Sequence, residues 1–288
     1  VQIFLYRTDL FHDAKLCRAY YERFHENLVV PTTYQQYLHA AEFFTRSCNP
    51  DSPTEYGTTM TCGSASVAAS DFLPFYLSRI DRFGSTPETL RLDSPEMQAA
   101  MRQYHALEKF SCKQNWWGDS IQKFAEGKTA MTVIYSNYAA ELINSGNSVV
   151  VGRVGAAILP GCKPLLGGGI VGISRYSQKA EACKQFFHWY YSADVASLLV
   201  RLGGTSPIVD AYEDFQNYSI FPWMNTSKKS FGLGQRGVKN QTPERFSIPK
   251  YEFAVGTAVR NVVQDLMTPE DASRMAQALY DAADPVSR

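Results

Sequence analysis

Tyrosines and small polar residues follow a short apolar run, MTVIY (131–135), where side chains of these types could bind a ligand. The exit of this strand-like run is marked by Tyr135, Ser136, Asn137 and Tyr138. A tyrosine ring can cover the apolar face of a sugar-like ligand, and amide or hydroxyl groups can hydrogen-bond its polar edges. The same rings would be plain core if they pack between elements. The segment therefore predicts either a ligand platform or interior packing.

The motifs of common enzyme mechanisms do not occur in this sequence. There is no G-x-S-x-G elbow, no phosphate-binding loop and no H-E-x-x-H zinc motif. The five histidines are dispersed, and no cysteine–histidine or paired-carboxylate pattern stands out. The glycines of LLGGGIVG (165–172) precede an expected strand and do not join a strand to a helix, so they make a weak phosphate cradle. The sequence favours a binding protein without cofactor or metal over an enzyme.

The six cysteines are too scattered for a metal site. No two of them have C-x-x-C spacing, which argues against zinc. An even number permits three disulfides, but a chain of this size favours buried free thiols. The cysteines leave the cellular compartment open.

The elements that must position these residues alternate between helices and short strands. Strand-like runs occur at 1–7, near 58–62 and at 151–160, and a further strand is expected directly after the glycines at 167–169. Helical patterns occupy 9–28, 31–44, 94–110, the stretch between Trp117 and the turn at Gly127, 177–204 (with a break near Ser192), 251–267 and 268–283. Thr32 or Thr33, Ser94 and Thr268 are the expected N-caps. Residues 211–249 read as irregular. The alternation predicts an α/β fold with mixed sheets covered by helices on both faces.

Size and charge restrict the partners. The chain has 288 residues, enough for one large or two smaller domains. Lys+Arg and Asp+Glu both number 28, so no basic field favours nucleic acid. No apolar run approaches the ~20 residues that a membrane helix needs. The chain begins at Val1 without a signal peptide, and we expect that its natural start lies upstream.

Several segments occur in an order that resembles one protein family. They are YRTDLFHD (6–13), PTTYQQYLHAAEFFT (31–45), FAEGKTAM (124–131), LLGGGIVGIS (165–174), RLGGTSP (201–207) and TPEDASRMAQAL (268–279). This order and spacing is similar to the extracellular solute-binding proteins of carbohydrate ABC transporters, the subgroup that includes the maltose-binding protein. FAEGKTAM is the most specific piece.

The resemblance implies a type II periplasmic-binding-protein fold, with a ligand cleft between two α/β lobes. On this basis residues 1–165 form the first part of the second lobe, 166–214 return to the first lobe, and 215–288 supply closing helices of the second lobe. The opening segment of the first lobe would then be absent. Residues 167–215 would have no sheet to pack on unless other residues provide one.

The resemblance also assigns cleft residues. In the family, the loop after the strand at 131–135 enters the cleft, which makes its residues ligand candidates. The full candidate set is Ser66, Tyr135, Ser136, Asn137, Tyr138, Gly168, Gly169, Ser206, Tyr251 and Glu252. Gly169 stands where the family has an aromatic residue, so one stacking platform is missing. For Glu252, a solvated carboxylate at a helix start is the alternative interpretation, and Ser64 is an alternative to Ser66.

Trp116 and Trp117 are expected to lie away from the cleft, in core or surface packing. For the glycines at 167–169, a tight turn with positive φ is the alternative explanation, and it would account for one or two of them.

The expected function is capture of a mono- or oligosaccharide and its delivery to the permease subunits of an ABC importer. The implied location is extracellular or periplasmic, with membrane contact only through a lipid anchor or the permease. A ligand-sensing domain of a regulatory protein with the same fold is the alternative. A glycosidase is the third hypothesis, and it would need two carboxylates across one cleft.

Overall fold

The structure is a computed structural model that describes residues 1–80, 91–143, 146, 148–169, 171–234 and 247–282. Its strands are β1 (Gln2–Arg7), β2 (Thr58–Thr61), β3 (Ser111–Gln114), β4 (Met131–Tyr135) and β5 (Val154–Ala157). Its α-helices are α1 (Thr8–Phe11), α2 (Ala14–Phe24), α3 (Tyr34–Phe43), α4 (Ala65–Leu77), α5 (Pro95–Glu108), α6 (Trp117–Ala125), α7 (Ala180–Tyr190), α8 (Ala193–Arg201), α9 (Phe215–Ile220), α10 (Met224–Leu233), α11 (Ile248–Val263) and α12 (Pro269–Asp281). Short 3₁₀ helices are η2 (Ser136–Ile143), η3 (Pro160–Cys162) and η4 (Val209–Tyr212).

Strand β1 is the centre of an antiparallel sheet with the order β4-β1-β5. Phe4 is paired with Val133 of β4 and with Ala157 of β5. Because side chains alternate along a strand, Ile3 and Leu5 enter one core cluster and Phe4 enters another on the opposite face. Burial on both faces explains why β1 reads as a continuous apolar run.

A second, parallel pair of strands extends this arrangement. β2 pairs in parallel with β3, and an isolated bridge joins Tyr56 to Thr129 just before β4. The hydroxyls of Thr59 and Thr132 lie 2.7 Å apart and hydrogen-bond across the gap between β2 and β4. The mixed sheets carry helices on both faces, which confirms the predicted α/β class.

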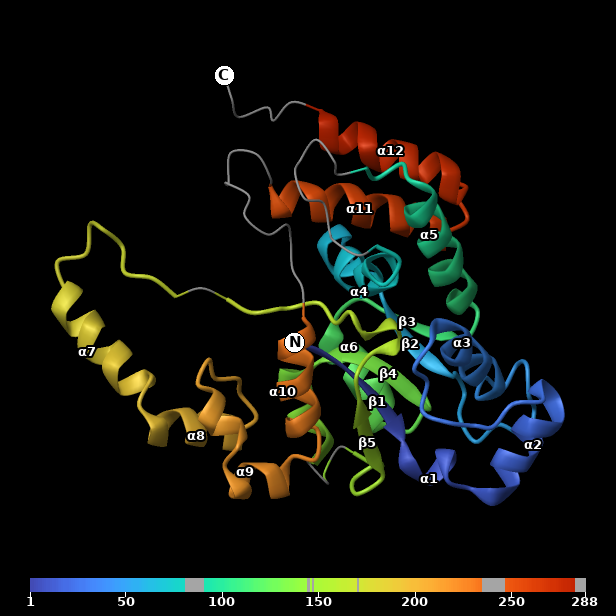
Figure 1. Ribbon diagram of the computed structural model, residues 1–288, viewed down its shortest axis with the longest axis horizontal. Coiled ribbons are helices and arrows are strands. Elements are labelled where there is room, and N and C mark those ends of the chain that lie inside the picture. Colours follow the sequence, from blue (N-terminus) through green and yellow to red (C-terminus); the bar gives the residue numbers. More distant parts are fainter. Residues whose placement is uncertain (81–90, 144–145, 147, 170, 235–246, 283–288) are drawn as a thin grey trace.

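Two groups of helices cover the sheets (Figure 1). Helices α3, α4, α5, α11 and α12 build the core cluster on the Phe4 face. Helices α6, α8 and α10 contribute to the cluster on the Ile3 face. In Figure 1, α7–α10 lie to the left of β1, and α4, α5, α11 and α12 lie above it. The sheet of β4, β1 and β5 therefore has one group of helices on each of its two faces.

Three predicted helix starts are confirmed by their caps. The side-chain oxygen of Thr33 accepts a hydrogen bond from the N–H of Gln36, within a full capping box. Ser94 caps α5, and Thr268 caps α12. Each cap satisfies a backbone N–H that has no partner within its helix.

The strand expected after the glycines is not formed. Residues 171–174 have no regular secondary structure, and Val171 is 69% exposed. Among the described residues no strand lies beside them, so their backbone groups have no ladder to join. A β-branched run without a neighbouring strand stays a connection.

Three α-helices, α4, α9 and α10, were not predicted. Helix α10 falls in the region that reads as irregular, because serines occupy inward positions where apolar residues were expected, and Ser227 and Ser230 are fully buried. Helix α4 is buried on nearly all sides and contains Pro74, so it shows no one-sided pattern. Residues 235–246, which belong to the same expected irregular region as α10, lie outside the described residues.

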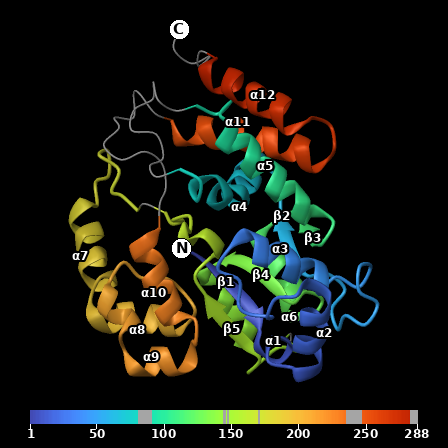
Figure 2. The same ribbon diagram turned by 45° about the vertical axis from the view of Figure 1, so that its right-hand side comes forward.

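Helix α7 has an apolar face but no buried residue. Figure 2 shows it at the outer edge of the molecule, beside α8 and α10. Phe186 is 49% exposed and Trp189 58%. No layer within the described chain covers this face.

Two global features complete the fold. No disulfide forms among the six cysteines. Cys162 is exposed and the other five are half-buried. The thiols are therefore free, as expected, but they are less buried than expected. Within the described ranges, no helix combines the length and the apolar character that crossing a membrane requires.

Candidate functional site

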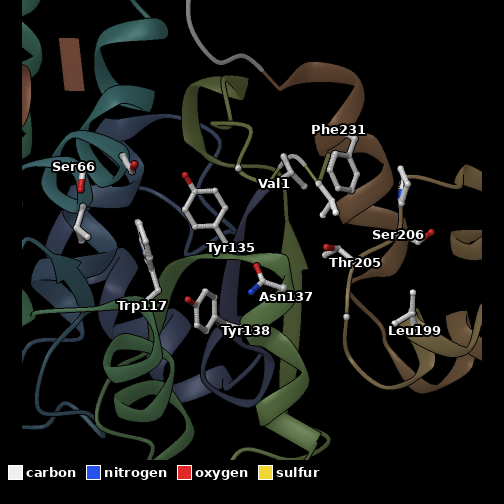
Figure 3. Close-up of a pocket in the computed structure, with 18 of the residues that line it drawn as sticks. Val1, Ser66, Trp117, Tyr135, Asn137, Tyr138, Leu199, Thr205, Ser206 and Phe231 are labelled. Carbon is white, nitrogen blue, oxygen red and sulfur yellow. The ribbon is translucent and has the colours of Figure 1, made fainter. Parts of the chain in front are cut away.

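A cleft of about 970 Å³ opens between the two groups of helices. Its first wall consists of Ser66, Val67, Ser70, Trp116, Trp117, Tyr135, Asn137 and Tyr138. Its second wall consists of Tyr190, Tyr191, Leu199, Gly204, Thr205, Ser206, Pro207 and Phe231. Val1, Gly167, Gly168, Gly169, Val171 and Glu252 complete the lining. Figure 3 shows labelled members of the two walls facing each other across the cleft.

The exit of β4 supplies the middle of the first wall. The Ser136 N–H donates to the carbonyl of Val1 at 2.8 Å, and the strand gives way there to η2. Tyr135, Asn137 and Tyr138 lie together around the cleft in Figure 3. Tyr135 is almost buried, whereas Asn137 is exposed. A rigid ring and an accessible amide therefore stand side by side.

The two tryptophans are placed differently from the expectation. Both line the cleft, because α6 begins beside the end of β4. The rings of Trp117 and Tyr135 meet edge to face, 5.0 Å apart, and Trp116 packs on Trp117 at 4.6 Å while remaining 48% exposed. The sequence feature that could have placed the two tryptophans in the cleft is their position directly before a helix that leads into a buried strand.

The three glycines border the same wall. A Cβ on Gly167 would lie 2.6 Å from the Tyr135 ring, so the close approach of this backbone requires glycine. Gly168 has a φ of +129°, which glycine adopts without strain. The Cβ direction of Gly169 meets open space. The turn explanation therefore accounts for Gly168, and close packing accounts for Gly167.

Serines occupy both walls. The Ser64 hydroxyl caps α4 by accepting from the N–H of Val67. Ser66, two residues later, lies on the first wall of the cleft. Ser206 lies on the second wall, where its N–H donates to the Tyr212 hydroxyl at 2.9 Å. These bonds hold the wall backbone in place.

The second wall adds aromatic rings that sequence reasoning missed. Tyr190 and Tyr191 come from the end of α7, with ring centroids 5.3 Å apart. Phe231 comes from α10 and is 37% exposed. The run FFHWYY showed that aromatic residues gather here, but it could not show which of them face β4.

Two candidate residues do not reach the cleft. Tyr251 is buried in the core cluster, where α11 packs against α4. Burial, then the neighbouring Tyr76 and Glu252, raise the pKa of Tyr251 well above its usual value. Ser136 is 7% exposed and borders a separate small cavity behind the first wall.

Glu252 does line the cleft and is 7% exposed. The alternative of a solvated carboxylate is therefore wrong. Among the described residues of the lining it is the only carboxylate, and no lysine, arginine or histidine joins it. A glycosidase needs a pair of carboxylates, which this set does not provide. Elsewhere in the described chain, no group of three or more histidine, cysteine, aspartate or glutamate residues could hold a metal.

The chemistry of the cleft suits binding. Its seven aromatic side chains are Trp116, Trp117, Tyr135, Tyr138, Tyr190, Tyr191 and Phe231. Between them lie hydroxyls, one amide and the glycine backbone. Such a mixture covers apolar ring faces and bonds polar edges.

Comparisons with known proteins agree with this geometry. A sequence model of the bacterial extracellular solute-binding proteins matches residues 1–223. Among solved structures, an ABC transporter solute-binding protein from Agrobacterium radiobacter in complex with ribitol is 21% identical, with a TM-score of 0.71 over 96% of this chain and 68% of its own. One from Agrobacterium vitis with D-mannitol is 18% identical, with a TM-score of 0.71 over 97% and 70%. The maltose-bound MalE3 of T. maritima is 21% identical, with a TM-score of 0.73 over 96% and 69%. These likenesses show a shared fold.

Proposed function

The chain belongs to the bacterial extracellular solute-binding protein family, and from this premise we propose that its cleft captures a carbohydrate for an ABC importer. The observation that carries the proposal is the pair of aromatic walls with polar groups between them. A sugar or polyol presents C–H faces to rings and hydroxyls to amides and backbone. The relatives in complex with ribitol, D-mannitol and maltose support this ligand class.

The ligand would bridge the two walls. Trp117 and Tyr135 offer rings from one side, and Tyr190 and Phe231 offer rings from the other. Contacts with both walls would draw the helices α7–α10 toward β4, because the ligand replaces water between them. This closed form would be the one that docks on permease subunits.

The finer parts of the assignment extend the same proposal. We place the protein outside the cytoplasmic membrane, held there by the permease or by a lipid anchor, and without enzymatic turnover. Lobe boundaries at residues 165 and 214 remain a prediction. Of the candidate ligand residues, Ser66, Tyr135, Asn137, Tyr138, Gly168, Gly169, Ser206 and Glu252 keep that role in the proposal.

Calorimetric titration against mono- and oligosaccharides and polyols tests the function, with amino acids and inorganic anions as controls. The expected result is saturable binding of one sugar class. Trp117→Ala should then raise Kd at least about 10-fold, because it removes a ring from the first wall. Trp189→Ala is the matched control, since Trp189 is an exposed tryptophan outside the cleft lining. Binding confined to amino acids or anions, or equal effects of both variants, would contradict the proposal.

A further inference from the structure

Gln2 is a buried amide at the start of β1, with 1% of its surface exposed. Its side chain makes two hydrogen bonds to the backbone of distant segments. The Nε2 group donates to the carbonyl of Ser70 in α4 at 2.8 Å, and Oε1 accepts from the N–H of Leu165 at 2.9 Å. The backbone N–H of Gln2 also donates to the carbonyl of Leu165 at 3.1 Å. One residue therefore joins β1 to α4 and to the segment that follows η3.

The carbonyl of Ser70 needs a donor from outside its own helix. In an α-helix such a carbonyl accepts a hydrogen bond from the N–H of the residue four positions later. That residue is Pro74, which lies inside α4 and has no N–H. The side-chain amide of Gln2 supplies a donor in its place. The proline therefore makes one carbonyl of α4 available as a contact point for β1.

Each segment that Gln2 contacts carries part of the cleft lining. Ser70 itself lines the cleft. Leu165 comes directly before the segment that holds the three lining glycines at 167–169. In the register of β1 and β4, Gln2 is paired with Tyr135, whose ring belongs to the first wall. Gln2 is not one of the described residues that line the cleft, so it lies behind the lining and connects three parts of it.

We propose that Gln2 is a positioning residue of the cleft, which does not touch the ligand but holds α4, β4 and the glycine segment at the spacing that ligand binding needs. The proposal rests on carbohydrate capture as the function. Loss of the amide would leave a buried carbonyl at Ser70 and a buried N–H at Leu165 without their partners. The backbone at both places would then move to find new partners, and the lining residues next to them would move with it.

The first test replaces Gln2 with methionine, which keeps the length of the side chain and removes both of its hydrogen bonds. The probes are maltose, D-mannitol and ribitol, the ligands of the similar structures. Kd is measured by calorimetry with whichever of them the parent protein binds, at a temperature where both proteins are fully folded. Gln2→Met should raise this Kd about 10-fold, because the lining residues are held less closely to the geometry that binding needs.

Thr45→Val is the matched control for the loss of buried hydrogen bonds. Thr45 is 1% exposed, and its hydroxyl also joins separate segments, because it donates to the carbonyl of Ala41 at 2.7 Å and accepts from the N–H of Gly57 at 2.9 Å. Thr45 lies outside the cleft lining. Thr45→Val should lower the melting temperature, as Gln2→Met does, but leave Kd within about 2-fold of the parent value.

A double-variant cycle tests the contact with Ser70 separately. In Pro74→Ala, the new N–H of residue 74 can form the ordinary helix hydrogen bond to the carbonyl of Ser70. The amide of Gln2 then has a competitor, so Gln2→Met should weaken binding less in this background. We expect its effect on Kd to fall from about 10-fold to about 3-fold. An equal effect in both backgrounds would overturn the role of the Ser70 contact.

Hydrogen exchange tests the proposal on the unmodified protein, so this measurement does not depend on the folding of a variant. Coupling between two events is reciprocal, so if loss of the Gln2 contacts weakens binding about 10-fold, a bound ligand must disfavour that loss by the same factor. The N–H of Leu165 should therefore exchange about 10-fold more slowly with saturating maltose, D-mannitol or ribitol. The N–H of Gly57, which donates to Thr45, should slow much less.

The outcomes separate this inference from the function on which it rests. An unchanged Kd in Gln2→Met, or the same increase in Thr45→Val, would overturn the positioning role and leave carbohydrate capture standing. Equal slowing of exchange at Leu165 and Gly57 would overturn the positioning role as well. If the parent protein binds neither the three probes nor the wider panel of sugars and polyols, the proposed function fails and this inference fails with it.

Discussion

Asp71 shows at the scale of one residue how burial sets a charge. It lies in α4 and is 8% exposed, and it accepts hydrogen bonds from the Tyr104 hydroxyl at 2.7 Å and from the Thr61 N–H at 3.2 Å. Burial raises its pKa to about 7, although both hydrogen bonds favour the charged form. The effect of burial on the pKa of Asp71 is thus larger than the opposite effect of the two hydrogen bonds.

This raised pKa predicts a pH-dependent stability. The folded state keeps the proton of Asp71 at pH values where the unfolded state has released it, so stability falls as pH rises from about 4 to about 7. Between pH 5 and pH 8 the loss from this group is about 3 kcal/mol. Asp71→Asn cannot titrate, so its stability relative to the parent should rise over that interval. Urea unfolding of both proteins at the two pH values measures the difference, and an equal difference at both would contradict the assignment.

Part of the candidate site could be predicted from the types of individual residues in the sequence. Tyr135, Asn137 and Tyr138 were identified because aromatic and amide groups follow a buried strand. Trp116 and Trp117 were misplaced, because residue type alone does not tell which side of a helix start faces a cleft. Their position depends on α6 beginning beside the end of β4.

At the scale of elements, one glycine fixes the closest helix contact near the cleft. A Cβ on Gly256 of α11 would lie 1.7 Å from the carbonyl oxygen of Ala65 in α4. Both helices also contribute to the cleft, through Glu252 and Ser66. The spacing of α4 and α11 therefore positions part of the cleft lining.

Gly256→Ala should destabilise the protein by about 3 kcal/mol or more, because the two helices must separate. In an unobstructed helix the same change is favourable, and Gly232→Ala in α10 has open space and should stabilise by about 0.5–1 kcal/mol. Thermal and urea unfolding of the two variants gives the comparison. Destabilisation by both, or by neither, would refute the close-contact explanation.

Local sequence predicted most helices with their caps, because caps and one-sided apolar patterns are short-range signals. Helices α4 and α10 escaped prediction for opposite reasons. The first is apolar on nearly all sides, and the second buries serines. Their helical state depends on the layers that pack around them.

At the scale of the whole molecule, helix α7 leaves a face of aromatic side chains exposed. Phe186 packs on Trp189 and Tyr190 at centroid distances of 5.6 and 5.7 Å, yet no residue of this helix is buried. Contiguous apolar patches of this kind promote association in water, whereas single exposed apolar residues do not.

The double change Phe186→Ser and Trp189→Ser should lower both the binding of an apolar dye and the concentration-dependent self-association of this 288-residue chain. Leu266→Ser is the control, because Leu266 is 67% exposed in the turn after α11. Dye fluorescence and sedimentation velocity provide the two measurements. Unchanged self-association of the double variant would show that the aromatic face of α7 is not the surface through which the chains associate.

The sequence by itself determined the α/β class, the family and the strand that delivers tyrosines to a cleft. These depend on periodicity, caps and segment order, which are local properties of the chain. Only the tertiary structure decided that two tryptophans join Tyr135 and that Tyr190 and Phe231 oppose it. It also decided that Glu252 lines the cleft while Tyr251 is buried in the core. These outcomes depend on how separate helices pack around β1, and no local pattern encodes that packing.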